Sequence, residues 1–319
     1  MRLFDFLYVI YFKLPSFYGW GILGKVYRHA LTDSFKWFLT LFYRDRIRNS
    51  VAYEALDPEQ LTYDKPIVVS LTSYQGRIDV VDIAVKCLLR QTVKANRIVI
   101  WLAVEEFTED TLPESIRDLR HYGVEIRFCD NLLAHKKYFY ALQEFTDSYI
   151  ITFDDDFFFE RNMIANAMEL KLKHPDCITT NRAHLMRFQD GTLLPYRQWR
   201  HNTIYAQPAH HVFATGGVGT VYESHLLQDH IFDLEAIRQL SPRADDVWLK
   251  FMAYLNGVKV VTDKRYNKDF ITLPESQKEQ LVKSNVNEGG NDAQIRNMLT
   301  HYKINANSLL HSAAKSAHE

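Results

Sequence analysis

Apolar residues in the first half of the chain follow two alternating patterns, one typical of buried strands and one typical of helices. Residues 67–71 and 97–102 are mostly apolar runs rich in β-branched side chains, and each predicts a buried strand. Between them, Val81, Val85 and Leu88 recur at the spacing of a helix with one apolar face. The three segments together predict a βαβ unit, in which a helix joins two parallel strands.

The same alternation continues farther along the chain. Residues 112–122 predict a helix that Gly123 closes, and residues 124–128 alternate as a strand does. Residues 136–145 predict another helix, before a strand that ends at Asp154. Strands that alternate with helices predict an α/β fold with a doubly wound, mostly parallel sheet, whose ligands bind beyond the carboxyl ends of the strands.

The second half of the chain is less regular. A helix is predicted over residues 161–173 and a strand over residues 178–180. Ser241, with a proline after it, predicts the N-cap of a further helix with an apolar stripe. This places Asp245 and Asp246 in the first turn of that helix.

Length and composition limit the class of protein. The chain has 319 residues, 47% of them hydrophobic and 24% charged, so it can bury the core of one large α/β domain or of two smaller ones. The formal net charge of −1 excludes the strongly basic balance of a general nucleic-acid binder. The three cysteines, Cys87, Cys129 and Cys177, lack the spacing of a zinc site and are expected to be reduced, buried residues of a cytosolic protein.

Residues 1–62 are predicted to form an extension ahead of the α/β domain. Residues 1–48 are unusually aromatic and carry eight Lys or Arg against three Asp, so 8 minus 3 leaves a local excess of +5. The longest apolar run, broken by Asp5 and Lys13, is too short to span a bilayer and lacks the cleavage site of a signal peptide. Two interpretations stay open. The segment binds a membrane interface, or its helices pack on the main domain or form a dimer contact.

Three consecutive acids, Asp154, Asp155 and Asp156, follow a β-branched apolar run. Adjacent carboxylates repel one another, and their oxygens are the ligands that Mg²⁺ or Mn²⁺ prefers, above all where a diphosphate supplies the remaining oxygens. The tripeptide therefore predicts a site for a divalent metal ion and a diphosphate. The alternative is a solvated acidic turn, which is the usual fate of a short charge run.

Six motifs follow one another along the chain: Ser70-Leu71-Thr72-Ser73-Tyr74, Leu88-Leu89-Arg90-Gln91-Thr92, Lys137-Tyr138-Phe139-Tyr140-Ala141-Leu142, Ile151-Thr152-Phe153-Asp154-Asp155-Asp156, Gly216-Gly217-Val218-Gly219 and Ala244-Asp245-Asp246-Val247-Trp248. Together they resemble the motifs of the GT-A fold nucleotide-sugar glycosyltransferases. More narrowly, the chain resembles the bacterial enzymes, related to family 2, that build capsule and lipopolysaccharide glycans. The resemblance covers roughly residues 66–265 and implies a catalytic domain over 63–265, with a nucleotide-binding half up to residue 156 and an acceptor half after it, followed by a C-terminal segment over 266–319.

The resemblance implies that the strand-end acids bind a nucleotide-sugar donor, UDP-linked, through a Mn²⁺ or Mg²⁺ ion. Asp156 would ligate the metal, and Asp154 would hold the ribose or help to orient the metal. His210 and His211 are candidates for a third ligand, with His211 preferred and a structural role as the alternative for each. A metal ion that bridges the phosphates stabilises the charge of the leaving diphosphate. Further donor contacts are implied for Thr72, Ser73, Tyr74, Arg77, Lys137, Asp155 and Gly217.

An inverting glycosyltransferase also needs a carboxylate that takes the proton of the acceptor hydroxyl. The resemblance implies that Asp246 is this general base and that Asp245 orients an acceptor hydroxyl, with the reverse assignment as the alternative. The polar and aromatic stretch over residues 187–207 is interpreted as facing the acceptor. Without the strand-end acids, an acidic pair in a first helical turn would be ordinary compensation of the helix dipole.

The sequence therefore predicts a metal-dependent inverting glycosyltransferase that acts on a bacterial surface glycan, free or lipid-linked, at the inner face of the cytoplasmic membrane. A peripheral membrane contact is expected and a nucleic-acid partner is not. Two alternatives stay open. One is a GT-A fold nucleotidyltransferase, although residues 70–74 lack the glycine- and arginine-rich phosphate loop of that class. The other is a non-catalytic glycan-binding protein. The patterns do not specify the donor sugar, the linkage or the oligomeric state.

Overall fold

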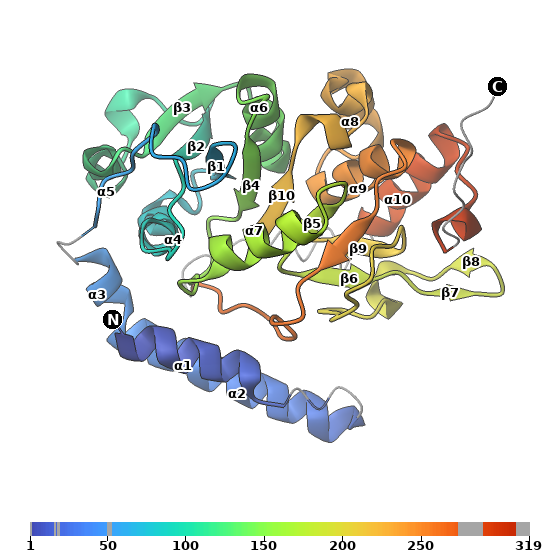
Figure 1. Ribbon diagram of the computed structural model, residues 1–319, viewed down its shortest axis with the longest axis horizontal. Coiled ribbons are helices and arrows are strands. Elements are labelled where there is room, and N and C mark those ends of the chain that lie inside the picture. The colour runs from blue at the N-terminus through green and yellow to red at the C-terminus, as the bar shows by residue number, and fades with distance from the viewer. Residues whose placement is uncertain (1, 16, 18–19, 50–52, 274–289, 311–319) are drawn as a thin grey trace.

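A seven-stranded, mostly parallel sheet forms the centre of the molecule (Figure 1). The computed structural model describes residues 2–15, 17, 20–49, 53–273 and 290–310. Across the sheet the strands follow the order β11-β5-β10-β4-β1-β2-β3. Their bounds are β1 (Ile67–Thr72), β2 (Arg97–Ala103), β3 (Glu125–Cys129), β4 (Tyr149–Phe153), β5 (Ile178–Thr180), β10 (Val218–Tyr222) and β11 (Val260–Thr262).

Strand β10 runs against the direction of its neighbours. It pairs antiparallel with β4 and β5, whereas the other neighbouring strands of this sheet pair in parallel. The register places Val218, the first residue of β10, opposite Phe153, the last residue of β4. The amino end of β10 therefore lies at the same edge of the sheet as the carboxyl ends of β1, β4 and β5.

Helices cover both faces of the sheet, because successive side chains of a strand point to opposite faces. In β1, Val69 belongs to one core cluster and Val68 to the other. The first cluster joins the sheet to α4, α5 and α7, and the second joins it to α6, α8, α9 and α10. The helices are α1 (Arg2–Lys13), α2 (Gly21–Phe42), α3 (Arg44–Arg48), α4 (Ile78–Leu89), α5 (Glu114–Arg117), α6 (Lys136–Glu144), α7 (Met163–Lys173), α8 (Leu234–Leu240), α9 (Asp245–Leu255) and α10 (Gly290–His301).

Two small antiparallel sheets lie in the second half of the chain. Strand β6 (Ala183–Leu185) pairs with β9 (Val212–Ala214), and β7 (Phe188–Gln189) pairs with β8 (Thr192–Leu193). They fall within and around the polar and aromatic stretch that the sequence left without regular elements.

The predicted fold class is confirmed: the protein is α/β, with a doubly wound, mostly parallel sheet and a helical N-terminal extension. The strands predicted over residues 67–71, 97–102 and 124–128 are β1, β2 and β3. The helices predicted over residues 136–145 and 161–173 are α6 and α7. Local periodicity was sufficient for these elements because each buries one continuous face.

The single helix predicted over residues 112–122 was wrong. Only Glu114–Arg117 is α-helical, and the chain continues as a 3₁₀ helix over Asp118–Tyr122. Gly123 ends it as predicted, with a left-handed φ of 79°. The tighter turn allows the amide of Val124 to donate to the carbonyl of Leu119, which directs the chain straight into β3.

The predicted N-cap role of Ser241 was also wrong. Helix α9 begins at Asp245 with Ala244 as its N-cap residue, whereas Ser241 follows the last residue of α8. The Ser241 hydroxyl donates to the carbonyl of Ala244 at 2.9 Å, so it holds the turn between the two helices.

The four-residue glycine motif divides in a way that the sequence did not predict, because Gly216 and Gly217 precede β10 and Gly219 lies inside it.

The N-terminal extension packs on the domain through one face of α1. The hydroxyl of Tyr8 donates to the carbonyl of Phe158 at 2.8 Å and accepts from the amide of Ile271 at 3.1 Å. Helix α2 lies beside α1, and the ring of Phe35 lies 5.7 Å from that of Tyr8 (Figure 1). Packing on the domain is therefore confirmed, and the membrane contact stays a prediction. Within the described ranges, no helix combines the length and the hydropathy of a membrane span.

All three cysteines are free thiols; Cys87 and Cys129 are buried as predicted, whereas Cys177 is only half-buried. Tyr266 and Phe270, placed by the predicted boundaries in the C-terminal segment, share a core cluster with Tyr8 of the extension. The boundaries after residues 62 and 265 stay predictions.

We expect Tyr8→Phe to lower the free energy of unfolding by about 1–3 kcal/mol, because it leaves a buried carbonyl and a buried amide without their partner. Chemical denaturation measures the change. Tyr205→Phe, at an exposed side chain, is the control and should stay within about 0.5 kcal/mol of the parent. Equal stability of Tyr8→Phe and the parent would contradict the anchoring of the extension through this hydroxyl.

Candidate active site

Strand β4 delivers Asp154 to the edge of the sheet. The amide of Asp154 donates to the carbonyl of Gly217 at 2.8 Å, which extends the ladder between β4 and β10 by one step. Its carboxylate is partly exposed and accepts from Lys137 Nζ at 2.6 Å. Burial would raise the pKa of Asp154, but the charge of Lys137 holds this pKa below its ordinary value. Asp154 is therefore an ionised carboxylate that solvent can reach.

Asp155 and the first βα turn hold each other in place. Ser73 Oγ donates to Asp155 Oδ2 at 2.5 Å, and Arg77 Nη1 donates to Asp155 Oδ1 at 3.0 Å. The Arg77 guanidinium also lies over the ring of Tyr74, 5.5 Å from its centroid. Thr72 Oγ1 donates to a backbone carbonyl of β2 at 2.7 Å. These contacts bring Ser73, Tyr74 and Arg77 beside the acids, while the predicted donor contacts of this turn stay predictions.

Asp156 keeps one carboxylate oxygen without a partner. Its Oδ2 lies 3.0 Å from Arg77 Nη1, whereas its buried Oδ1 has no hydrogen-bond partner within the described part of the chain. Burial, opposed by the charge of Arg77 and reinforced by Asp155 and Asp154, raises the pKa of Asp156 to about 7. A buried acceptor without a donor is costly, and a divalent cation would satisfy it.

The first two residues of α9 form a second acidic pair at the same edge. Asp245 Oδ2 lies 3.0 Å from Lys137 Nζ, and Asp246 Oδ1 accepts from the amide of Gly216 at 2.6 Å. Burial and the neighbouring charge of Asp245 raise the pKa of Asp246 to about 7, against the opposing effect of Lys137. The prediction that both acids begin this helix is confirmed.

A single ammonium joins the two acidic groups. Lys137 Nζ lies between Asp154 and Asp245, and the side chain is only 5% exposed. Burial alone would lower the pKa of Lys137, but the charges of Asp154, Asp245 and Asp246 raise it well above its ordinary value. Lys137 is therefore charged and engaged with carboxylates, and its predicted phosphate contact stays a prediction.

Gly216 and Gly217 lie between the two acidic groups, where no side chain fits. A Cβ on Gly217 would lie 1.8 Å from Asp154 Oδ2, and one on Gly216 would lie 2.9 Å from Asp246 Oδ1. Thr152 Oγ1 holds the dipeptide in place by donating to the carbonyl of Gly216 at 2.6 Å. Glycine at these two positions therefore allows the carboxylates of Asp246 and Asp154 to lie close to the backbone.

Arg182 belongs to the site although the sequence pattern did not single it out. It follows β5 at the same edge of the sheet, and its Nε donates to Thr215 Oγ1 at 2.7 Å. Its guanidinium lies over the ring of Phe157, 5.4 Å from the centroid, and its charge opposes the upward pKa shift of Asp156. The sequence feature that could have identified Arg182 is its position just after the strand predicted over residues 178–180.

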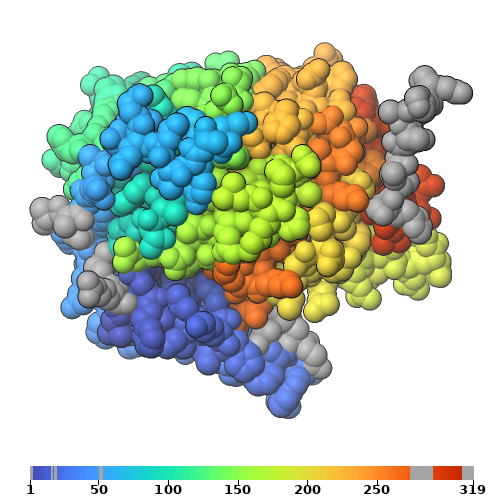
Figure 2. Space-filling view, viewed as in Figure 1, coloured from blue at the N-terminus to red at the C-terminus, as the bar shows by residue number. Residues whose placement is uncertain are grey.

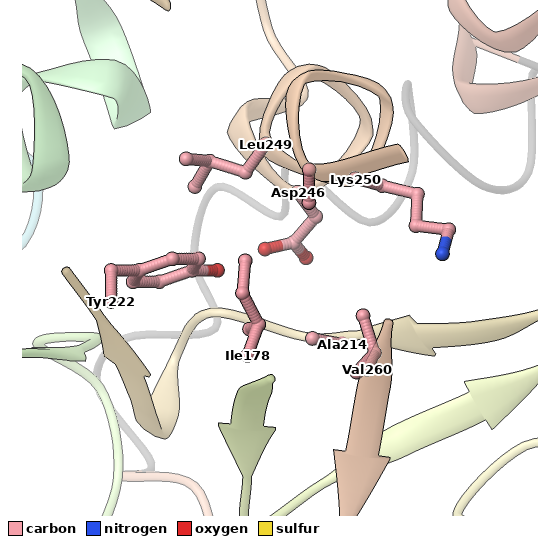
Figure 3. A pocket seen from close by; sticks show the side chains of 8 residues that line it. Ile178, Ala214, Tyr222, Asp246, Leu249, Lys250 and Val260 are labelled. Carbon is pink, nitrogen blue, oxygen red and sulfur yellow. The ribbon is translucent and has the colours of Figure 1, made fainter. Parts of the chain in front are cut away.

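A small cavity of about 10 Å³ lies between α9 and the sheet (Figure 3). The Asp246 carboxylate points toward the hydroxyl of Tyr222, and Lys250 extends away from both. Lys250 Nζ is buried, has no hydrogen-bond partner among the described residues, and burial lowers the pKa of Lys250 to about 7. Tyr222 and Lys250 sit inside apolar strand and helix patterns, so no local signal marked them. The cavity has room for about one water molecule.

His211 lies just before β9, with its ring 5.2 Å from that of Tyr205. Burial and the charge of Lys250 lower the pKa of His211. In the part of the chain that the structure describes, it makes no hydrogen bond or ion pair with Asp154 or Asp156, and no three His, Cys, Asp or Glu side chains are placed to hold a metal ion. Its predicted role as third ligand therefore has no support from the geometry.

Asp154 and Asp156 nevertheless fit a divalent ion that a nucleotide also binds. Mg²⁺ commonly takes one or two carboxylates and completes its shell with phosphate oxygens and water. The partly exposed carboxylate of Asp154 and the unpartnered Oδ1 of Asp156 match such an incomplete donor set.

Comparisons with known proteins add likenesses of fold only. No family model matches the chain, and no curated protein matches it in sequence. It is similar to the mannosyltransferase PcManGT from Pyrobaculum calidifontis in complex with GDP-Man and Mn²⁺, with 14% identity, a TM-score of 0.49, and 88% of this chain and 78% of that chain covered. It is also similar to S. aureus TarS 1–349, with 15% identity, a TM-score of 0.42 and coverage of 75% and 72%. A third likeness is to 4-diphosphocytidyl-2C-methyl-D-erythritol synthase, with 10% identity, a TM-score of 0.41 and coverage of 70% and 97%. Likenesses this distant carry no argument about chemistry, so the function has to be argued from the site.

We expect Gly217→Ala to weaken Mn²⁺ binding by at least about tenfold, because the new Cβ displaces the Asp154 carboxylate. Titration calorimetry with MnCl₂ and a nucleoside diphosphate measures the affinity. The control is Gly257→Ala, where a Cβ meets nothing within 4 Å; its φ of 71° costs about 1 kcal/mol of stability but leaves metal binding unchanged. Equal Mn²⁺ affinity in Gly217→Ala and the parent would contradict the role of the close approach.

Proposed function

We propose that this protein is an inverting, metal-dependent glycosyltransferase that uses a nucleotide-sugar donor. One observation carries the proposal. An acidic group suited to a metal diphosphate and an acidic pair suited to general-base catalysis meet at Lys137, at the carboxyl edge of a doubly wound sheet. Ligands of open α/β sheets bind at this edge, so donor and acceptor would lie side by side there.

On the donor side, Asp154 and Asp156 would hold a Mn²⁺ or Mg²⁺ ion. When bound, the ion supplies positive charge to the diphosphate as the bond to the sugar breaks. Arg77 keeps Asp155 and Asp156 together, and so fixes the second ligand relative to the first βα turn. We propose that the donor is UDP-linked, as the motif resemblance implies.

On the acceptor side, Asp246 would take the proton of the attacking hydroxyl. The acceptor oxygen forms a bond to the anomeric carbon, the bond from that carbon to the diphosphate oxygen breaks, and the proton passes to the Asp246 carboxylate. A pKa of about 7 suits this task, because a base whose pKa lies near the working pH is both available and strong enough. Asp245, held by Lys137, would orient an acceptor hydroxyl.

The motif resemblance extends the proposal to the acceptor and the location. We propose that the acceptor is a bacterial surface glycan of the capsule or lipopolysaccharide type, and that the protein works in the cytoplasm at the inner face of the membrane. We assign acceptor contact to residues 187–207, which the buried rings of Tyr196 and Trp199, packed 4.8 Å apart, attach to the domain.

We expect Asp156→Ala to abolish metal-dependent donor binding while the fold is retained. The remaining carboxylates repel one another less after the change, so stability should not fall. Titration of Mn²⁺ with a nucleoside diphosphate should show a loss of at least about tenfold in affinity, and circular dichroism should be unchanged. Asp229→Ala, at an exposed acid, is the control. Unaltered Mn²⁺ affinity, or full transfer in the presence of a chelator, would refute the metal assignment.

We expect Asp246→Asn to lower kcat by about 10²–10⁴-fold and to leave the KM for the donor nearly unchanged, because deprotonation matters in the transition state. In the parent, log kcat/KM should rise with pH up to about 7 and level off above it, since the base acts only when it has lost its proton. The measurement uses saturating Mn²⁺ because Asp156 titrates in the same range. Lost donor binding with normal turnover, or retention of the anomeric configuration in the product, would contradict the assigned role.

A further inference from the structure

The exposed apolar side chains of this protein are concentrated on its N-terminal helices. Of the sixteen large apolar side chains that the described residues expose, nine lie on or beside α1 and α2. Ile22 is 81% exposed, Trp20 64% and Trp37 63%. Exposed apolar side chains gathered on one part of a surface mark a site of interaction with a protein or a membrane. The nine are Leu3, Phe6, Trp20, Ile22, Leu23, Val26, Trp37, Leu41 and Phe42.

These side chains are separate from the ones that attach the helices to the domain. Phe4, Tyr8 and Tyr11 of α1 and Leu39 of α2 are fully buried in the core cluster of the domain. The two helices form one edge of the molecule (Figure 2). Helix α2 has 22 residues and is therefore about 33 Å long. The packed face accounts for how the helices are held, so the outer apolar face requires another explanation.

The charge of the two helices is positive. Residues of the domain neutralise the charges of Asp5 and Arg48, because Asp5 pairs with Arg90 and Arg48 pairs with Asp82. Seven basic residues remain against Asp33 and Asp45 in residues 1–48, and 7 minus 2 again leaves +5. Lys13, Lys25 and Arg46 are among the exposed ones.

We propose that the outer face of α1 and α2 docks on the interface of an anionic phospholipid bilayer. Tryptophan and phenylalanine side chains beside Lys and Arg are the composition of helices that lie in the plane of a membrane interface. A second copy of the chain is a poorer occupant, because a twofold contact would place the same positive surface against itself. An anionic surface instead attracts Lys and Arg and accepts the apolar side chains between them.

Helix α2, which carries most of the docking face, is linked by direct contacts to the segment of the strand-end acids. Lys36 of α2 donates to Thr272 Oγ1 at 2.9 Å, and Thr272 pairs with Phe157, the residue after Asp156. The amide of Leu273 donates to the carbonyl of Asp156 at 2.7 Å. Residues 272 and 273 therefore connect α2 to the donor side of the site. If the proposed function holds, the acceptor that this arrangement suits is carried by a lipid.

Intrinsic fluorescence tests the proposal on the full chain without any substrate. Trp20 and Trp37 are exposed, whereas Trp101, Trp199 and Trp248 are buried, so a change in emission on mixing with vesicles reports the docking face. We expect a blue shift and protection from aqueous quenchers with vesicles of phosphatidylcholine and phosphatidylglycerol. The shift should be much smaller with phosphatidylcholine alone and should decrease at high salt, which screens charges within a Debye length of about 10 Å at 0.1 M.

Substitutions on the face distinguish docking from nonspecific adsorption. The combined variant Ile22→Gln, Val26→Gln and Trp37→Gln should sediment with anionic vesicles on the order of tenfold more weakly than the parent. Leu172→Gln, at an exposed leucine of α7, is the matched control and should bind as the parent does. The single variants Ile22→Gln and Trp37→Gln, each weaker than the parent, replace the combined one if it does not fold.

Three results would overturn the proposal. These are an unchanged emission spectrum with anionic vesicles, equal vesicle binding by the combined variant and the control, and a dimer in solution that the same substitutions dissociate. Because no donor or acceptor is present, these results do not depend on whether the protein transfers sugar. Failure of the proposed function would instead appear as absent turnover with vesicle binding intact.

Discussion

The buried ammonium of Lys137 is the constraint on which the rest of the site depends. It lies within 3.0 Å of carboxylate oxygens from both Asp154 and Asp245, which come from different elements of the fold. Unpaired charges are costly to bury, and adjacent carboxylates repel, so acids from β4 and α9 can share one edge of the sheet only beside a cation. Burial raises the pKa values of Asp156 and Asp246 to about 7, although the charge of Arg77 opposes the first shift and the charge of Lys137 opposes the second. The strand-end acids and the acidic pair of α9 therefore each contain one carboxyl, Asp156 and Asp246, whose pKa is about 7.

The reversed direction of β10 brings the two groups together. Because β10 is antiparallel, the residues before it, and not those after it, meet the carboxyl ends of β4 and β5. Gly216 and Gly217 occupy this position, and each lies so close to a carboxylate that a Cβ would collide with it. The glycines therefore determine the separation of the donor acids from the proposed base. The same edge is supported from behind by residues 266–273 and by α1, so the N-terminal extension stabilises the segment that follows the acids.

Much of this fold could be predicted from the sequence, because β1 to β4 and the helices α4 and α6 bury continuous faces that leave a local pattern. The acids at 154–156 and at 245–246 also stand out locally, as charges next to apolar runs. Contacts between distant segments left no such signal. Ser241 is a residue type typical of an N-cap, but its hydroxyl donates to the carbonyl of Ala244 in a turn. Lys250 has the sequence position of a polar residue on an amphipathic helix, although it is buried. The environment of Arg182 depends on β5 and β10 being neighbours, which no local pattern specifies.

Release of nucleoside diphosphate from a panel of nucleotide sugars tests the central claim most directly, because it requires the donor site alone and no knowledge of the acceptor. The account predicts slow release from one donor or a few, dependent on Mn²⁺ or Mg²⁺ and abolished by a chelator. Equal release in the presence of chelator, or no release and no metal-dependent binding for any donor of the panel, would contradict it.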